Sequence, residues 1–130
     1  MIVQRGNEIE EHDLGALLGK PDIGIKSQQL LREQIGKNGQ GRLLDLKYIL
    51  VRAGMVCPWH QNDYFEANIV ISGQARMKCG SQDFTLGEGD IAYSQSGESY
   101  ELINASGAPL KVLAVTIRET VKNSNKNKEE

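Results

Sequence analysis

The chain has few of the residues from which metal centres, disulfide networks and basic surfaces are built. Its two histidines, His12 and His60, cannot by themselves supply a three-histidine metal centre. Its two cysteines, Cys57 and Cys79, form no C-x-x-C pair, and we expect both to be thiols in a reducing compartment. Fifteen Lys and Arg against seventeen Asp and Glu give a formal net charge of -2. This balance argues against nucleic acid as a partner.

Long hydrophobic runs are also missing. Apolar runs such as Ile69-Val70-Ile71 are too short to cross a bilayer, and the N-terminus lacks the apolar core of a signal peptide. We therefore predict a cytoplasmic protein without a membrane partner. With 130 residues the chain has the length of one domain, which can bury enough surface to fold without a disulfide or a metal.

Short β-rich runs separated by glycine turns fill the chain from Leu43 to Ile117. Such spacing is typical of an antiparallel sandwich or barrel, so we predict an all-β domain over residues 43–120. The predicted strands are Leu43–Arg52, Glu66–Ser72, Gln74–Cys79, Asp83–Leu86, Asp90–Ser94, Ser99–Asn104 and Leu110–Ile117.

Residues 1–42 are predicted to form a segment, partly helical or extended, that packs on or extends the barrel. Glu8–Leu18 fits a short helix with leucines on one side. Ser27–Ile35 fits either a helix capped by Ser27 or a strand, and a strand that ends in a hairpin loop at Gly36–Gly41 agrees better with an all-β domain. Residues 121–130 are polar apart from Val121, and we expect a disordered tail.

Several side chains are candidates for a functional site. His60, Asn62 and Glu66 have even spacing, so along a strand and its continuation they can share one face of a sheet. Glu66 opens an apolar run, where a carboxylate is costly unless a cation or a hydrogen-bond donor faces it. Tyr93 is expected to project inward opposite Glu66 and to offer a phenol as donor, acid or ligand.

Two glycine-framed motifs resemble the signatures of the cupin superfamily. The spacing Gly54-x5-His60-x-Asn62-x3-Glu66-x6-Gly73 resembles the first signature, with Asn62 in place of its second histidine. The spacing Gly89-x5-Gln95-x-Gly97-x2-Tyr100-x3-Asn104 resembles the second, with Gln95 and Tyr100 in place of its proline and histidine. The resemblance implies a small single-domain cupin, which is a jelly-roll β-barrel, with degenerate metal-ligand motifs.

In cupins the histidines and the glutamate of these motifs commonly hold one divalent transition metal. The resemblance therefore implies metal ligands at His60, Asn62, Glu66 and Tyr100, for Fe, Mn, Ni, Cu or Zn. Only His60 and Glu66 keep the usual ligand chemistry, and Tyr100 has to lose its proton to bind strongly. The glycines and Asn104 are expected to shape turns.

Three functions remain open at this point, and with them whether the chain is an enzyme. The first is a metal-dependent lyase, isomerase or oxygenase of a small polar metabolite, with His60, Glu66 and Tyr100 or Asn62 around the metal. The second is a metal-free isomerase, epimerase or cyclase, with His60 as base and Tyr100 or Tyr93 as acid. The third is a barrel that binds a small molecule without catalysis.

The resemblance also implies a homodimer, because many small cupins pair through an N-terminal strand or a sheet edge. The apolar runs Leu43-Leu44 and Leu110–Ile117 are the candidates for such a contact.

Overall fold

Ten strands in two sheets dominate the computed structural model, which describes residues 1–17, 19–20, 23–36, 41–58, 64–94 and 98–119. The strands are β1 (Glu11–Asp13), β2 (Ile25–Ile35), β3 (Arg42–Val51), β4 (Val56–Pro58), β5 (Phe65–Ser72), β6 (Ala75–Cys79), β7 (Gln82–Leu86), β8 (Ile91–Ser94), β9 (Glu101–Ile103) and β10 (Leu110–Glu119). A 3-10 turn, η1 (Gly6–Glu8), and one helical turn, α1 (Leu14–Leu17), complete the elements. No helix in the described part of the chain is long and apolar enough to span a membrane.

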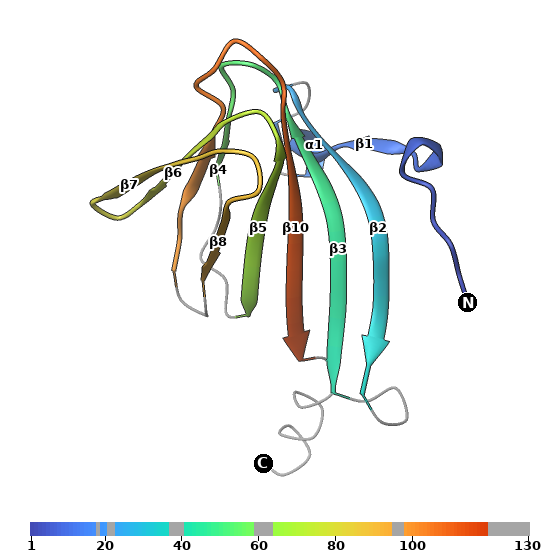
Figure 1. The fold of residues 1–130 in the computed structure, drawn as a ribbon. Helices are drawn as coiled ribbons and strands as arrows, with labels where there is room; N and C mark the ends of the chain where they lie inside the picture. Colours follow the sequence, from blue (N-terminus) through green and yellow to red (C-terminus); the bar gives the residue numbers. More distant parts are fainter. Residues whose placement is uncertain (18, 21–22, 37–40, 59–63, 95–97, 120–130) are drawn as a thin grey trace.

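The two sheets face each other (Figure 1). The larger has the order β1-β2-β3-β10-β5-β8 and the smaller has the order β4-β9-β6-β7, and the neighbouring strands are antiparallel. This arrangement confirms the predicted all-β jelly-roll class. Each strand predicted between residues 43 and 117 is present, and β4 was not predicted because its three residues leave no detectable pattern.

The N-terminal segment differs from its prediction in one part. Ser27–Ile35 is a strand, as favoured, and lies within β2, which pairs with β3 along its length. The helix predicted over Glu8–Leu18 is wrong, because Glu11–Asp13 pairs with Lys26–Gln28 as β1 and only one helical turn follows. Pairing with β2 outweighs the weak helical preference of this stretch. The expected tail at 121–130 lies outside the described residues.

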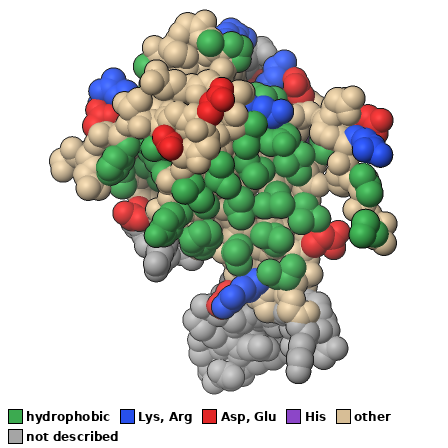
Figure 2. All heavy atoms as spheres, viewed as in Figure 1, with side chains coloured by type: hydrophobic (Ala, Val, Ile, Leu, Met, Phe, Trp, Pro, Cys, Tyr) green, Lys and Arg blue, Asp and Glu red, His purple; other side chains and the backbone are tan. Residues whose placement is uncertain are grey.

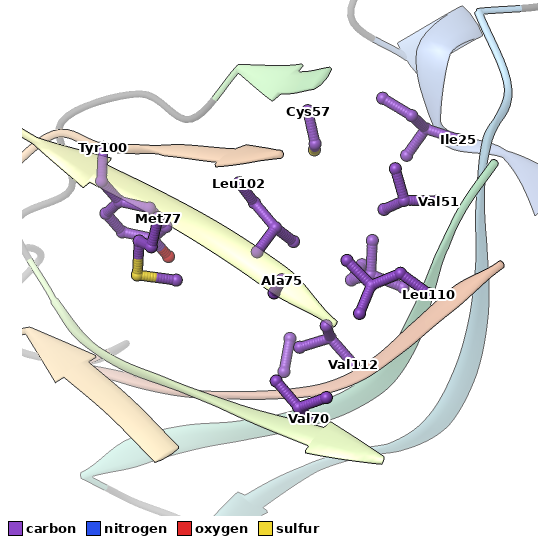
Figure 3. Packing of buried hydrophobic residues seen from close by; sticks show 12 residues of the cluster. Ile25, Val51, Cys57, Val70, Ala75, Met77, Tyr100, Leu102, Leu110 and Val112 are labelled. Carbon is purple, nitrogen blue, oxygen red and sulfur yellow. The ribbon is translucent and has the colours of Figure 1, made fainter. Parts of the chain in front are cut away.

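The hydrophobic core fills the space between the sheets. Figure 3 shows Ile25, Val51, Leu110 and Val112 of the larger sheet packed toward the smaller one. The smaller sheet contributes four buried side chains: Cys57, Ala75, Met77 and Leu102. Each is at most 6% exposed, so these side chains belong to one buried cluster between the sheets.

Toward the other end of the larger sheet, the inner face changes from apolar to polar. Along β5 the inward positions read Val70, Asn68 and Glu66, and all three are buried. The pairing register places Thr116 of β10 beside Glu66, and Asp45 of β3 beside Thr116. Buried polar groups need hydrogen-bond partners, so this polar row is the place to look for a functional site.

Candidate functional site

Glu66 and Asn68 lie next to each other on the inner face of β5. Alternation along a strand places residues two apart on the same face, and the apolar neighbours in this strand fix which face is buried. Glu66 is 2% exposed and Asn68 is 3% exposed. A carboxylate at this depth requires hydrogen bonds that stabilise its charge.

Tyr100 joins both side chains. It lies directly before β9 and is 6% exposed. Its hydroxyl donates a hydrogen bond to Oε1 of Glu66 over 2.5 Å. The same hydroxyl oxygen accepts a hydrogen bond from Nδ2 of Asn68 over 2.9 Å. The three residues, called the Glu66 triad below, therefore form one buried hydrogen-bonded chain.

The proton of Tyr100 is held firmly. Burial raises the pKa of the phenol, and the negative charge of Glu66 and the hydrogen bond to Glu66 raise it further. The hydrogen bond from Asn68 lowers this pKa, but it does not outweigh the other causes. Tyr100 is consequently a neutral phenol at physiological pH, and its hydroxyl acts as a donor toward Glu66.

Two buried polar atoms beside the triad have no hydrogen-bond partner within the part of the chain that the structure describes. They are Oδ1 of Asn68 and Oγ1 of Thr116. Thr116 is the cross-strand neighbour of Glu66, so both atoms border the same carboxylate. Unpaired buried polar groups are rare in folded proteins and commonly face a ligand or water.

A cavity of about 180 Å³ adjoins the triad. Asn68 and Tyr100 line it together with side chains from the smaller sheet and from β8, and Glu98 is the one formally charged residue among the described lining residues. The described residues of its wall are Asn68, Met77, Cys79, Gln82, Phe84, Ala92, Tyr93, Ser94, Glu98 and Tyr100. The arrangement suits a small ligand with an apolar part and at least one hydrogen-bond donor.

The structure brings together two of the residues that the sequence singled out, Glu66 and Tyr100. His60 and Asn62 lie outside the described residues, so their convergence on this site stays a prediction. Asn104 shapes a turn as expected, because its buried amide donates to two backbone carbonyls.

The inward position expected for Tyr93 is wrong. Ala67, not Glu66, lies across from Tyr93 on β5, and successive residues of a strand point to opposite faces. The ring centroid of Tyr93 is 6.1 Å from that of Phe65, and the residue is 67% exposed. Tyr93 reaches the cavity wall without meeting the carboxylate of Glu66.

Cys57 is a buried thiol of low reactivity. It is 1% exposed, and burial together with the charge of Glu66 raises its pKa to about 12. A thiol in this state has almost no nucleophilic thiolate at neutral pH.

Sequence reasoning missed Asn68 and Thr116. The even spacing from Glu66 to Asn68 was available as a signal, because both positions fall on one face of a strand. Thr116 carried no local signal, since only the pairing of β10 with β5 places it beside Glu66.

Of the four metal ligands that the motifs imply, only Glu66 and Tyr100 lie among the described residues. No group of three or more His, Cys, Asp and Glu side chains among the described residues could hold a metal ion. Tyr100, at the position of the last histidine, keeps its proton and directs it at Glu66. A phenol in this state is a poor ligand, because strong metal binding needs the phenolate.

Solved structures with the same fold have low sequence identity to this chain. A predicted oxalate decarboxylase from Thermotoga maritima is 24% identical, with a TM-score of 0.73 over 89% of this chain and 98% of that one. The Schizosaccharomyces pombe Cnp3 cupin domain is 10% identical, with a TM-score of 0.73 over 97% and 80%. The polyketide cyclase RemF from Streptomyces resistomycificus is 15% identical, with a TM-score of 0.70 over 92% and 85%.

No curated protein matches the sequence. The family model described as Cupin domain matches residues 48–116, which is more than half of the 130 residues. Its matched region runs from β3 to β10 and includes every member of the Glu66 triad. The chain therefore belongs to the cupin family.

Proposed function

We propose that the chain binds a small polar molecule in the cavity beside the Glu66 triad and moves a proton on it without a metal, as an isomerase, epimerase or cyclase. The observation that carries this proposal is the hydrogen bond of 2.5 Å from the Tyr100 hydroxyl to the Glu66 carboxylate. It joins a proton donor to a buried base at the wall of a cavity, which is the arrangement that general acid–base catalysis needs.

Tyr100 is the contact between the cavity and Glu66. Its hydroxyl donates to Glu66 and accepts from Asn68, and Tyr100 itself lines the cavity. When the ligand gives a proton to the Tyr100 oxygen, the original phenol proton passes to Glu66. Tyr100 ends neutral, Glu66 ends protonated, and the ligand has lost one proton. The reverse transfer at another atom of the ligand completes an isomerisation.

The raised pKa of Tyr100 fits this role. A phenol that stays neutral passes a proton along without holding negative charge in the buried site. Asn68 fixes the direction of the transfer, because its amide donates to the phenol oxygen and leaves the phenol proton for Glu66.

The cavity favours a neutral or cationic ligand. Glu98 is the charged residue among its described lining residues, and Glu66 lies behind Tyr100, so an anionic ligand meets repulsion. The unpaired Oδ1 of Asn68 accepts a hydrogen bond, which selects a ligand with a hydroxyl, amine or amide donor. About 180 Å³ limits that ligand to a small molecule.

The comparisons are compatible with this chemistry at the level of the fold. Among the structural neighbours, RemF is a polyketide cyclase, whereas another is a predicted oxalate decarboxylase. A dicarboxylate such as oxalate carries two negative charges and suits this acidic cavity poorly.

The second candidate is the metal-dependent lyase, isomerase or oxygenase, with ligands from His60, Asn62, Glu66 and Tyr100. The unpaired amide oxygen of Asn68 supports it, because oxygen donors beside a carboxylate attract cations. It requires Tyr100 to give up its proton or to be replaced as a ligand.

A ligand screen under chelation separates the two candidates. Nuclear magnetic resonance detects binding of small polyols, amino alcohols and dicarboxylates to the chain before and after treatment with EDTA. We expect polyols or amino alcohols to bind equally in both states, and Tyr100→Phe to weaken binding at least tenfold, whereas Tyr48→Phe, on β3 and outside the cavity wall, does not. In deuterated water, bound ligand should exchange a carbon-bound proton only with the parent chain. Binding that appears only after a divalent metal is added would contradict the proposal and favour the metal-dependent candidate.

A further inference from the structure

The larger sheet is polar on its inner face near Glu66 and hydrophobic on its outer face. One row of paired residues crosses the inner face from β2 to β8: Arg32, Asp45, Thr116, Glu66 and Ser94. On the outer face, hydrophobic side chains cover the same strands in the view of Figure 2. A sheet that packs on a core usually carries its polar side chains on the outside. The reversed order makes this end of the inner face a candidate surface for a polar ligand.

Both carboxylates of this row have hydrogen-bond donors, but the hydroxyl group between them does not. Asp45 is 1% exposed and accepts hydrogen bonds from the side chains of Gln29 and Arg32. Glu66 is hydrogen-bonded within its triad. Thr116 lies between the two carboxylates and is 6% exposed, and its Oγ1 has no partner among the residues that the structure describes. This hydroxyl is therefore available to a group that the chain itself does not supply.

Arg118 is the next inward side chain along β10. Residues two apart on a strand share a face, so Arg118 follows Thr116 toward the end of β10, which Figure 1 shows beside the start of β5. Its Nε is buried and also has no hydrogen-bond partner in the described part of the chain. None of the ion pairs between described residues includes Arg118. Two neighbouring inward side chains thus have a buried polar atom that lacks a partner.

The aromatic ring of Tyr64 holds the guanidinium group of Arg118 from one side. Cζ of Arg118 lies over this ring, 4.6 Å from its centre, which is the distance of a cation–π contact. A guanidinium group that stacks on an aromatic face keeps the N–H bonds at its edge for acceptors. A carboxylate accepts two of these parallel N–H bonds at once. Arg118 is thus oriented for a planar anion such as a carboxylate.

We propose that Thr116 and Arg118 form a subsite for a carboxylate group of the ligand, and that the ligand is a small zwitterion with an ammonium group at its other end. The second part rests on the proposed function, in which a hydrogen-bond donor of the ligand binds Oδ1 of Asn68 in the cavity. An ammonium group is such a donor, and Glu98 in the cavity wall attracts its charge. A zwitterion is neutral overall, so it agrees with the charge preference of the cavity.

The positions of the two subsites set the length of the ligand. Asn68 lies on one side of the row that contains Glu66 and Thr116, and Arg118 lies on the other side. Two residues of strand at about 3.3 Å each and one strand spacing of about 4.8 Å separate the backbones of Asn68 and Thr116 by roughly 8 Å. An α-amino acid is too short for this separation, because its two charged groups are attached to the same carbon or its neighbour. A longer chain such as that of 5-aminopentanoate suits it, and its middle part then lies near Glu66.

Titration calorimetry with two probes of the same chain length tests the subsite. 5-Aminopentanoate carries both charged groups, whereas 5-aminopentanol has a hydroxyl group in place of the carboxylate. We expect the parent chain to bind 5-aminopentanoate at least about tenfold more tightly than 5-aminopentanol. Arg118→Gln should abolish this preference and leave the affinity for 5-aminopentanol unchanged. Arg5→Gln removes the same charge from an exposed residue near the N-terminus, so this matched control should keep the preference.

Thr116→Val separates ligand binding from folding. The substitution nearly keeps the shape of the side chain and removes a buried hydroxyl group that has no partner among the described residues, so stability should not fall. We expect an equal or higher melting temperature together with a several-fold weaker affinity for 5-aminopentanoate. A clear drop in the melting temperature with unchanged affinity would show that this hydroxyl group is structural, and would contradict the subsite.

The outcomes distinguish this subsite from the proposed function. If 5-aminopentanol binds and 5-aminopentanoate binds no better, or if Arg118→Gln keeps the preference, the carboxylate subsite is wrong and the proposed chemistry of the Glu66 triad is unaffected. If neither probe binds the parent chain, the zwitterion is wrong as well, and the missing affinity for an amino alcohol counts against the proposed function itself.

Discussion

Replacing Tyr100 by Phe should destabilise the protein strongly although it removes a single oxygen atom. The Tyr100 hydroxyl donates to the buried carboxylate of Glu66 and accepts from the amide of Asn68. Its loss takes one donor from a buried charge and leaves a buried amide donor without this acceptor. The benzene ring stays in place, so little of the effect comes from a cavity.

The expected cost follows from these two bonds. A hydrogen bond to a charged group contributes about 1.5–3 kcal/mol, and an unsatisfied buried donor costs about 1–3 kcal/mol. We therefore expect Tyr100→Phe to lower the free energy of unfolding by about 3 kcal/mol and the melting temperature by roughly 10 °C.

Urea unfolding followed by circular dichroism measures this difference at neutral pH, with Tyr93→Phe as the matched control. Tyr93 is 67% exposed, so its substitution should change stability by less than about 0.5 kcal/mol. Equal stability of Tyr100→Phe and the parent would refute the view that the Glu66 charge depends on this hydroxyl.

Three further predictions concern pH and the turns that frame the site. Stability should fall as the pH rises from about 9 toward 12, because the Cys57 thiol, with a folded-state pKa of about 12, keeps its proton after the unfolded thiol has lost it. The Cys57 thiol contributes a slope of about 1.4 kcal/mol per pH unit to this fall in the free energy of unfolding, and Cys57→Ala should remove that contribution. An unchanged slope in urea unfolding at alkaline pH would contradict the raised pKa of Cys57. Asn104→Ala should cost about 3 kcal/mol in the same assay, since its fully buried amide donates to two backbone carbonyls; a cost below about 1 kcal/mol would show that water replaces it. Gly73→Ala should destabilise markedly, because φ is +92° and a Cβ would lie 2.5 Å from the carbonyl oxygen of Pro109. Gly107→Ala, with no atom within 4 Å of its Cβ, is the control, and equal melting temperatures would contradict the strain.

The strands from 43 to 117 were predictable because each has its own local pattern. Period-two alternation and glycine turns are properties of short stretches, and Gly54, Gly73 and Gly89 do have the positive φ that such turns require. The segment Glu11–Asp13 was mispredicted because its structure depends on pairing with β2, which is a long-range contact.

The candidate site was predictable only in part. Glu66 and Tyr100 hold positions in the two motifs, and the facing sheets bring them into contact. The motif predicts Tyr100 as a metal ligand, which stays a prediction, and the contact of its hydroxyl as a donor to Glu66 comes from the packing of the two sheets. Glu66 pairs with Ser94, and Tyr93 is the residue next to Ser94 on the same strand. Because neighbouring residues of a strand point to opposite faces, the side chain of Tyr93 lies on the face opposite to Glu66. Such one-residue differences follow from strand pairing and not from composition.

The protonation state of Tyr100 tests the central claim most directly. Ultraviolet absorbance of the tyrosinate group, recorded as the difference between the parent chain and Tyr100→Phe, reports this phenol alone. The difference is followed during titration with Cu²⁺ or Fe³⁺ at neutral pH. We predict no tyrosinate signal and no tyrosinate-to-metal charge-transfer band from Tyr100 at a stoichiometric amount of metal. A band that appears with one equivalent of metal and disappears in Tyr100→Phe would contradict the claim and identify Tyr100 as a metal ligand.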